Sequence, residues 1–374
     1  KYWRDKKMKR REFVKKAGLG TTLGVIGATA LSAPVVAQSK KKVTIVSTWP
    51  RDFPGIGTAS QRLAARITEV SDGALTTEYF AAGERVGPFD CFDEVASGNS
   101  QAYMGAEAYW GGKHPAYFYF AFMPFGMTNT EWNAWIKFNG GQDLWDEVSS
   151  SFGLKAFACG GAGTQAGGWF NKEINSSDDL KGLKMRYPGL GGKIMSKLGA
   201  TTVSLPAGQI NEALTAGTID AAEFVGPYND YFMKFYESAK YYYTGGMQEP
   251  GGGLSMAFNA SWWGSLTSWE KSVIEACIEA ENARSFEENM AFNGKYLKKL
   301  VDEHGVKVRE FSDDTWDEFG IAAKEVFEEL RGHSDLVRKI DDSFQTNLRE
   351  IGTSLARFEG VFLNQRNRVL GITT

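Results

Sequence analysis

The chain has 374 residues, 43% hydrophobic and 23% charged, with a formal net charge of −3. This length predicts two domains, and the composition excludes a disordered chain, a collagen and a multi-span membrane protein. Residues 1–37 hold nine basic and two acidic residues, whereas residues 38–374 hold 33 basic and 43 acidic residues, a net of −10. Because sequence-independent nucleic-acid binding neutralises phosphates, we expect no nucleic-acid partner for so acidic a body.

The first 37 residues have the features of an export signal. Arg10-Arg11-Glu12-Phe13 resembles the twin-arginine core of a Tat signal. The uncharged stretch from Gly18 to Leu31 is too short to cross a hydrocarbon core of about 30 Å. A small-residue cleavage pattern ends at Ala37, so we expect cleavage near Ala37–Gln38 and a soluble periplasmic protein. We expect the signal to start at Met8, which leaves residues 1–7 as an upstream extension.

The cysteines predict neither a disulfide framework nor a zinc site. Cys91, Cys159 and Cys277 are odd in number, far apart and without a Cys-x-x-Cys pair. We expect all three to be reduced and buried in the core.

Strand and helix patterns alternate through the first part of the mature chain. This alternation predicts an α/β fold. The segments are a strand at Val43–Trp49, a helix at Ser60–Val70, a strand at Leu75–Phe80, a helix at Asp90–Ala96 and a strand at Gln101–Gly105.

A related unit recurs 119 positions later and suggests two lobes of similar architecture. In Ser97–Ala102 and again in Ala216–Ala221, a glycine ends a helix and a short polar link enters a strand. Ligands of open α/β sheets bind beyond the carboxyl ends of the strands. Glu107–Trp110 and Glu223–Tyr228 are therefore candidate cleft positions.

Two glycine clusters, five glycines in residues 157–168 and three in residues 250–253, predict two chain crossings of a hinge. The alternative is two ordinary surface loops. The expected divisions are lobe 1 at residues 38–164 plus about 252–300, lobe 2 at residues 165–251 plus about 301–334, and a C-terminal helix at residues 335–366.

The C-terminal helix is predicted by one apolar stripe that recurs at steps of three and four from Leu336 to Phe362. At 1.5 Å per residue it spans about 45 Å, longer than a lobe. We expect it either to straddle both lobes or to pack on another subunit. Gly352 and Gly360 weaken it locally.

The densest chemical signal lies between residues 182 and 228. Arg186 ends a short predicted strand beside the start of a helix, a position suited to binding a carboxylate. The alternative is an arginine paired with a surface acid. The glycines of residues 189–192 lack both the spacing and the Ser/Thr of a phosphate loop.

Glu223 lies in an otherwise apolar predicted strand, where an unpaired carboxylate is costly. If Arg186 holds an anionic ligand nearby, a proton or a cation must separate that ligand from Glu223. Glu223, the Gln165 side-chain oxygen, a main-chain carbonyl and ligand oxygens form an all-oxygen shell suited to Na⁺ or Ca²⁺. The alternative is a glutamate that points into water from an edge strand.

No nucleophile signature such as Gly-x-Ser-x-Gly is present, so we expect that the protein is not an enzyme. The eleven tryptophans leave an exported carbohydrate-active enzyme as the opposing hypothesis.

Several long motifs resemble the solute-binding proteins of TRAP (tripartite ATP-independent periplasmic) transporters, the DctP-type family. They are Gly167-Gly168-Trp169-Phe170, residues 179–186 and residues 212–221, and the resemblance extends over residues 43–365. Gln165, the Glu-x-Val-Gly-Pro-Tyr run at residues 223–228 and Tyr241-Tyr242-Tyr243 resemble the subgroup that binds 2-oxo acids and lactate.

The resemblance implies a two-lobed receptor with a hinge-lined ligand cleft, which closes on its ligand and delivers it to membrane permease subunits. It also implies dimers that exchange the C-terminal helix. The resemblance implies that Arg186 binds the ligand carboxylate. It implies that a cation is held by Gln165, Glu223 and the Phe224 main-chain oxygen, with Glu249 as an additional metal ligand. Tyr109 and Tyr228, at the two cleft positions, are further ligand-binding candidates.

The chain departs from the subgroup at Phe224, where a tryptophan is usual. The smaller ring has no N–H group, so it enlarges the pocket and removes a donor. The sequence therefore predicts a receptor for a pyruvate- or lactate-like 2-oxo or 2-hydroxy monocarboxylate, bound with a metal cation, and Phe224 favours a ligand bulkier or more apolar than pyruvate. The alternative is a TRAP receptor for an aromatic, sugar or dicarboxylic acid.

Overall fold

The computed structural model describes residues 40–251 and 253–372, so the predicted export signal lies outside the described residues. The described chain contains two mixed β-sheets covered by helices. None of the helices in these residues is long and apolar enough to cross a membrane. The α/β prediction is confirmed.

The first sheet has the strand order β2-β1-β3-β10-β4. β1 runs parallel to β2 and β3, and β10 is antiparallel to β3 and β4. The residues from Val43 to Ser47 are all buried, as expected for a strand covered on both faces. The strands are β1 (Lys41–Ser47), β2 (Leu75–Phe80), β3 (Ala102–Gly105), β4 (Leu154–Ala158) and β10 (Ser255–Asn259).

The second sheet has the strand order β11-β9-β5-β8-β6-β7, and β6 runs parallel to its neighbours β8 and β7. Its strands are short, so the sequence pattern marks them weakly. They are β5 (Gly168–Phe170), β6 (Lys184–Arg186), β7 (Thr201–Val203), β8 (Ala221–Ala222), β9 (Tyr241–Tyr243) and β11 (Lys307–Arg309).

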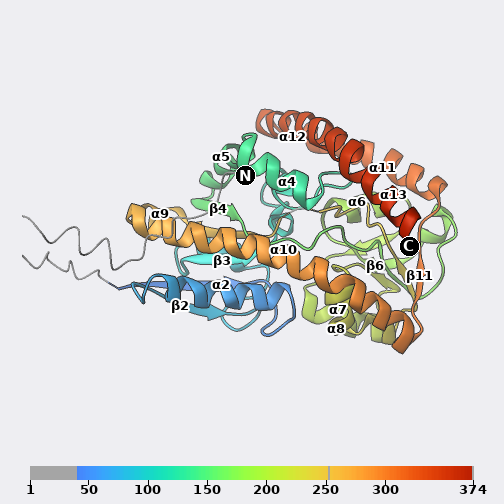
Figure 1. Ribbon diagram of the computed structural model, residues 1–374, viewed down its shortest axis with the longest axis horizontal. Helices are drawn as coiled ribbons and strands as arrows, with labels where there is room; N and C mark the ends of the chain where they lie inside the picture. The colour runs from blue at the N-terminus through green and yellow to red at the C-terminus, as the bar shows by residue number, and fades with distance from the viewer. Residues whose placement is uncertain (1–39, 252, 373–374) are drawn as a thin grey trace, which may run out of the picture. The chain divides into compact units, whose positions relative to one another are not determined.

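Helices flank both sheets (Figure 1). They are α2 (Ile56–Val70), α3 (Cys91–Ala96), α4 (Asn129–Phe138), α5 (Gly141–Ser150), α6 (Gly189–Lys197), α7 (Ala207–Thr215), α8 (Pro227–Met233), α9 (Ala260–Gly264), α10 (Ser268–His304), α11 (Asp313–Arg331), α12 (Asp335–Leu355) and α13 (Val361–Leu370). Short 3₁₀ helices are η1 (Glu107–Trp110), η2 (Pro115–Phe120), η3 (Ser177–Leu180) and η4 (Phe235–Glu237), and η5 (Ala356–Gly360) is a π-helical turn.

The two predicted crossings join the sheets as expected. Residues 159–167 connect β4 of the first sheet to β5 of the second, and residues 244–254 connect β9 of the second to β10 of the first. The glycines here allow close packing. A Cβ on Gly161 would lie 2.0 Å from the Asn129 side chain, and one on Gly253 would lie 2.0 Å from the Trp132 ring. The crossings are therefore tightly packed connections.

A third crossing is the 37-residue helix α10, which packs against α2 beside the first sheet and against α8 beside the second (Figure 1). Its middle buries polar residues, because Glu281, Asn282, Ser285 and Asn289 are each at most 6% exposed. The predicted residue boundaries of the two lobes stay a prediction.

The predicted C-terminal helix is present as α12, η5 and α13, without a break from Asp335 to Leu370. Its first half is anchored, because Ile340 and Phe344 are at most 2% exposed. Beyond Leu355 the same stripe is uncovered, and Phe358 is 75% and Phe362 63% exposed. The π-helical turn ends at Gly360, one of the two glycines expected to weaken the helix.

The remaining secondary-structure predictions hold with one exception. The repeated helix-to-strand unit corresponds to α3–β3 and α7–β8, with left-handed φ values of 83° at Gly98 and 68° at Gly217. All three cysteines are free and buried, as predicted. The exception is Glu223, which lies just beyond β8 and not inside a strand.

Candidate functional site

Two neighbouring parallel strands deliver the most polar part of the site. Arg186 is the last residue of β6 and pairs in register with Ala222, the last residue of β8. Glu223 follows directly, and its N–H donates to the Arg186 carbonyl at 3.1 Å. Arg186 and Glu223 therefore meet at the carboxyl ends of the strands, where α/β proteins bind ligands.

The two crossings bring Gln165 and Glu249 to the same place. The Gln165 N–H donates to the Glu249 carbonyl at 3.0 Å, and the Gly246 N–H donates to the Gln165 carbonyl at 2.9 Å. Gln165 is 5% and Glu249 8% exposed. Residues 84 positions apart in the sequence thus become neighbours because both crossings pass between the sheets.

Arg186, Gln165 and Glu249 line a cavity with about 330 Å³ of space between its atoms, open solvent included, and Glu223 is not among its lining residues. The cavity is narrow, so it suits a small ligand. It is lined by Trp49, Ile56, Tyr109, Phe122, Ala162, Gln165, Arg186, Pro188, Phe224, Val225, Glu249 and Leu254.

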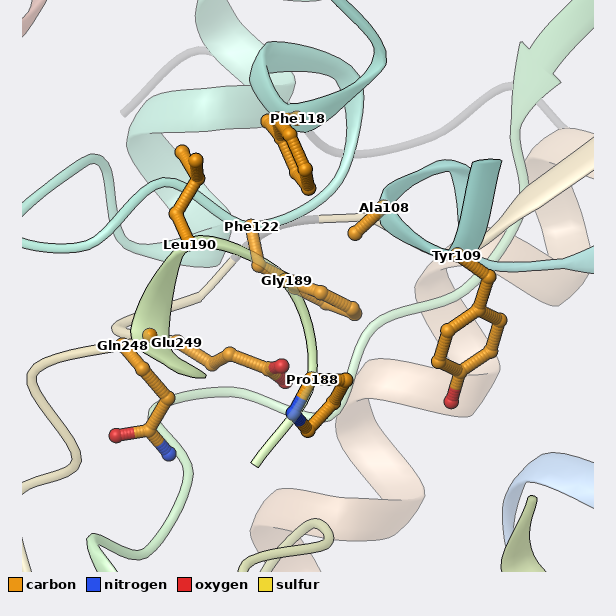
Figure 2. A pocket seen from close by; sticks show the side chains of 10 residues that line it. Ala108, Tyr109, Phe118, Phe122, Pro188, Gly189, Leu190, Gln248 and Glu249 are labelled. Atoms are coloured by element: carbon orange, nitrogen blue, oxygen red, sulfur yellow. The ribbon is translucent and has the colours of Figure 1, made fainter. Parts of the chain in front are cut away.

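An adjoining hollow of about 300 Å³ shares four of these residues (Figure 2). Figure 2 shows the Glu249 carboxylate near Pro188 and Gly189, where α6 begins, with Tyr109 on the opposite side. The glycines of α6 serve packing here, because a Cβ on Gly191 would lie 2.6 Å from the Gln248 side chain. This explains the glycine run without a phosphate.

Arg186 forms a buried ion pair with Glu223, in which Nη1 donates to Oε1. Nη1 also donates to the Glu223 carbonyl at 2.6 Å, and Nε donates to the Leu205 carbonyl at 3.2 Å. The side chains are 2% and 0% exposed. The alternatives of an arginine on a surface acid and a glutamate pointing into water are both wrong. These hydrogen bonds use Nε and Nη1 of the guanidinium, whose third nitrogen, Nη2, is also a donor.

Burial raises the pKa values of the two site carboxyls. The pKa of Glu223 rises to about 7, since desolvation outweighs the opposing effect of Arg186. Desolvation and the nearby Glu223 charge hold the pKa of Glu249 well above its usual range. Two neighbouring carboxylates that are buried away from water repel each other, so a proton or a cation must neutralise at least one of the two charges.

Two buried acceptor atoms in the site have no hydrogen-bond partner, Gln165 Oε1 and Glu223 Oε2. Such orphaned acceptors are costly unless a donor or cation meets them. Within the described residues, no cluster of three or more His, Cys, Asp or Glu could hold a metal ion. The residues fit a hard cation with mixed oxygen ligands, from an amide, a carboxylate and the main chain.

Phe224 lies on the cavity wall, 5% exposed, with its ring 5.7 Å from the Arg186 guanidinium carbon. The next N–H, of Val225, donates to Asp230 Oδ1 at 3.2 Å. Because a trans peptide is planar, this bond turns the Phe224 carbonyl away from Asp230. Trp169 and Tyr242 hold Asp230 in turn, with bonds of 2.9 and 3.0 Å.

The two candidate tyrosines have different surroundings. Tyr109 lines the cavity, and burial raises its pKa above the usual range against the opposing effect of the Arg186 charge. Tyr228 does not line it: the Tyr228 hydroxyl donates to Glu288 of α10 at 3.1 Å, and its ring packs 5.1 Å from Phe292. The structure therefore brings Tyr109, and not Tyr228, to the other site residues. Glu107 also lies outside the cavity, bonded to the Tyr103 hydroxyl at 2.9 Å.

Sequence reasoning missed two polar residues of the site, Trp49 and Asp230. Trp49 follows β1 of the first sheet and so lies at the carboxyl end of a strand, the signal that singled out Arg186. Asp230 is an acid in an aromatic segment, and it is 0% exposed.

The fold and site define a two-lobed α/β binding protein with a small cavity between its sheets, in which a few buried polar groups lie among apolar walls. The sequence matches DctP, the bacterial extracellular solute-binding protein family 7, over residues 45–332. The chain belongs to this family.

Three relatives illustrate the similarity. The monocarboxylate 2-oxoacid-binding periplasmic protein of Nostoc sp. strain PCC 7120 is 32% identical, over 92% of this chain and 95% of that protein. A TRAP periplasmic solute-binding protein of Pseudoalteromonas atlantica T6c, solved with sodium and pyruvate, is 35% identical with a TM-score of 0.84, covering 87% of this chain and 99% of its own.

The third is a TRAP solute-binding protein of Bordetella bronchiseptica RB50, 28% identical with a TM-score of 0.87, covering 90% of this chain and 99% of its own. It was solved as a mixed-occupancy dimer with copurified calcium and picolinate in one site. The resemblance to TRAP receptors and their 2-oxo acid subgroup is confirmed, and so is the periplasmic class. Relatives bind a carboxylate together with sodium or calcium.

Proposed function

We propose that this protein is the extracytoplasmic receptor of a TRAP transporter for a small 2-oxo or 2-hydroxy monocarboxylate, bound together with Na⁺ or Ca²⁺. The observation that carries the proposal is a cavity lined by the buried Arg186 and by Gln165, whose Oε1 has no partner, next to Glu223, whose Oε2 also has none. An arginine alone suits an anion, and orphaned acceptors alone suit a cation. Together they suit a carboxylate that shares its oxygens with a metal ion.

Arg186 binds the ligand carboxylate in this proposal. The cation is surrounded by protein oxygens from Gln165, Glu223, the Phe224 carbonyl and Glu249. When bound, the cation neutralises the carboxylates and polarises the ligand oxygens it touches. The Glu223 charge then no longer opposes the anionic ligand, which resolves the conflict between an acidic site and an acidic ligand.

The apolar walls set the size of the ligand side chain. Ile56, Phe122, Phe224 and Leu254 line the cavity and offer no charge to a second carboxylate. A dicarboxylic acid would leave one carboxylate buried without a partner, at a high desolvation cost. The picolinate found in the Bordetella protein keeps an aromatic monocarboxylate as the second candidate.

Closure of the two lobes traps the ligand for delivery to the permease. The Asn229 side chain, at the start of α8, donates to the Pro54 carbonyl of the first lobe at 2.7 Å. The rings of Phe53 and Phe224 meet edge to face at 5.9 Å. In our proposal these contacts join loops of the two predicted lobes and form only in the closed protein.

The exposed apolar stripe of the C-terminal helix supports a homodimer. Phe358, Phe362 and Leu370 are each more than 60% exposed, which is unusual for a monomer surface. A second copy of the chain covers this stripe in our proposal, and the dimeric Bordetella relative supports it.

Tat export is the proposed route to the periplasm, with cleavage near Ala37–Gln38, and it rests on the twin arginines Arg10 and Arg11. Replacing both by lysine should leave the precursor in the cytoplasm. Mature protein in the periplasmic fraction of that variant would exclude the Tat route.

A thermal-shift screen tests the proposed ligand class. Pyruvate, lactate, a branched 2-oxo acid, picolinate and succinate are each added with and without CaCl₂ or NaCl. Ligand at one hundred times its Kd stabilises the folded state by about 2.7 kcal/mol. Stabilisation by succinate alone would refute a monocarboxylate receptor. Each acid is also assayed for consumption, because turnover by the pure protein would favour the enzyme hypothesis.

A further inference from the structure

The indole N–H of Trp49 is a buried donor without a partner. Trp49 is 4% exposed, and its Nε1 forms no hydrogen bond within the protein. A buried tryptophan N–H usually finds an acceptor, because an unsatisfied donor costs stability. Trp110, Trp132 and Trp169 follow this rule, with bonds of 2.8–3.0 Å to protein oxygens.

Trp49 is held firmly in place. The main-chain N–H of Trp49 donates to Ser47 Oγ at 3.2 Å, and its main-chain carbonyl accepts from the Ala82 N–H at 2.9 Å. The Trp49 ring meets the Tyr109 ring edge to face at 5.9 Å. A fixed backbone and a packed ring leave the indole little freedom to find another acceptor. The orphaned donor is therefore a property of the site.

The surroundings of Trp49 indicate what it binds. It lines the same cavity as Arg186 and Gln165, whose Oε1 is an orphaned acceptor. An indole N–H can only donate, so its partner must be an oxygen or another acceptor.

We propose that Trp49 is a ligand-binding residue, whose indole N–H donates to an oxygen of the carboxylate or 2-oxo head group. This inference rests on the proposed function. It places a ligand contact in the first lobe, opposite Arg186 of the second. The ligand then bridges the two lobes, and the Trp49 bond exists only when the protein is closed.

Trp49→Phe tests the inference, because it removes the N–H and keeps an aromatic ring. The Kd for pyruvate, measured by calorimetry with CaCl₂ in excess, rises about 10- to 100-fold, the usual range for a bond to a charged acceptor. The urea midpoint of the ligand-free variant stays equal or rises, because an unsatisfied donor has been removed.

The chain offers a matched control in Trp145. It is 0% exposed, its Nε1 also has no partner, and it stacks on Phe120 at 5.3 Å, outside the cavity lining. Trp145→Phe leaves the Kd for pyruvate unchanged. Equal losses in both variants, or wild-type affinity in Trp49→Phe, would overturn the inference while leaving the receptor function intact. If the wild type binds none of the acids in the screen, the proposed function fails, and the inference fails with it.

A measurement on the wild-type protein removes any dependence on how the variant folds. The indole resonances of ¹⁵N-labelled protein are followed as pyruvate and CaCl₂ are added, with the Trp49 signal assigned by its absence in Trp49→Phe. The Trp49 indole proton shifts downfield and exchanges more slowly with water, and the Trp145 signal stays in place. A Trp49 signal unmoved at saturation would overturn the inference.

Discussion

The buried Arg186–Glu223 pair allows binding and folding to be separated. Arg186→Met removes the guanidinium, keeps an aliphatic chain of similar length, and leaves the Glu223 carboxylate in a site where both side chains are at most 2% exposed. Removing one partner of a buried ion pair costs about 3–5 kcal/mol of stability. The ligand carboxylate loses its partner as well, which costs about 2–5 kcal/mol, a Kd increase of roughly 30- to 5,000-fold.

The stability loss depends on pH in a predictable direction. The pKa of Glu223 is already raised to about 7, and Arg186 lowers it, so the variant raises this pKa further. A carboxyl with a raised pKa is protonated in the folded protein where the unfolded chain is ionised, so stability falls as pH rises. The destabilisation of Arg186→Met is therefore small near pH 5 and largest at pH 8 and above.

The double variant Arg186→Met/Glu223→Gln separates the two roles. Without a buried charge it recovers at least about 2 kcal/mol of the lost stability at pH 8. It does not recover binding, because the carboxylate partner is still missing. Urea denaturation at pH 5 and 8 and calorimetry with pyruvate measure both effects. Pyruvate affinity within threefold of wild type in Arg186→Met would remove Arg186 from the site, and a double variant no more stable than the single would refute the coupling.

Three further predictions address closure, core and assembly. Asn229→Ala loses the bond to Pro54, so ligand dissociation in stopped-flow accelerates about fivefold, the equivalent of about 1 kcal/mol; an unchanged off-rate contradicts its part in closure. Glu107 is 0% exposed, and burial raises its pKa from 4.5 to about 7. Its ionisation therefore costs the folded wild type about 3 kcal/mol of stability between pH 4.5 and pH 7, and Glu107→Gln abolishes this loss. Identical pH dependence of stability in both proteins would show that Glu107 does not cause the loss. Deletion of residues 356–374 converts a dimer into a folded monomer by light scattering, and equal oligomeric masses for the full and shortened chains would refute the helix-mediated dimer.

The sequence predicted the parts of the fold that follow a simple period. β1, β2 and α2 were recognisable because their buried residues are apolar and regularly spaced. The long helix α10 is not visible in this way, because Glu281, Asn282 and Ser285 occupy its buried face where it passes between the lobes. Polar residues can be buried there because partners from other elements meet them, such as Arg62 for Glu281. A search for regularly spaced apolar residues does not detect a buried helix face that is polar.

Gln165, Glu223 and Glu249 were predicted together from the charge conflict and the family motifs, and the structure brings them together. The direct pairing of Arg186 with Glu223 was not predictable, because it depends on the register of β6 and β8. Tyr228 was selected by its place in a motif, whereas the start of α8 turns it toward α10. The binding roles of these residues stay predictions.

The central claim is that a carboxylate and a cation bind as a unit. The most direct test is calorimetric titration of pyruvate into protein stripped of metal in sodium-free buffer, before and after CaCl₂ or NaCl is added. We predict that one of these cations lowers the Kd at least tenfold, because Glu223 and Glu249 oppose the anion until the cation neutralises them. Pyruvate binding that is equally tight without any metal would contradict the account.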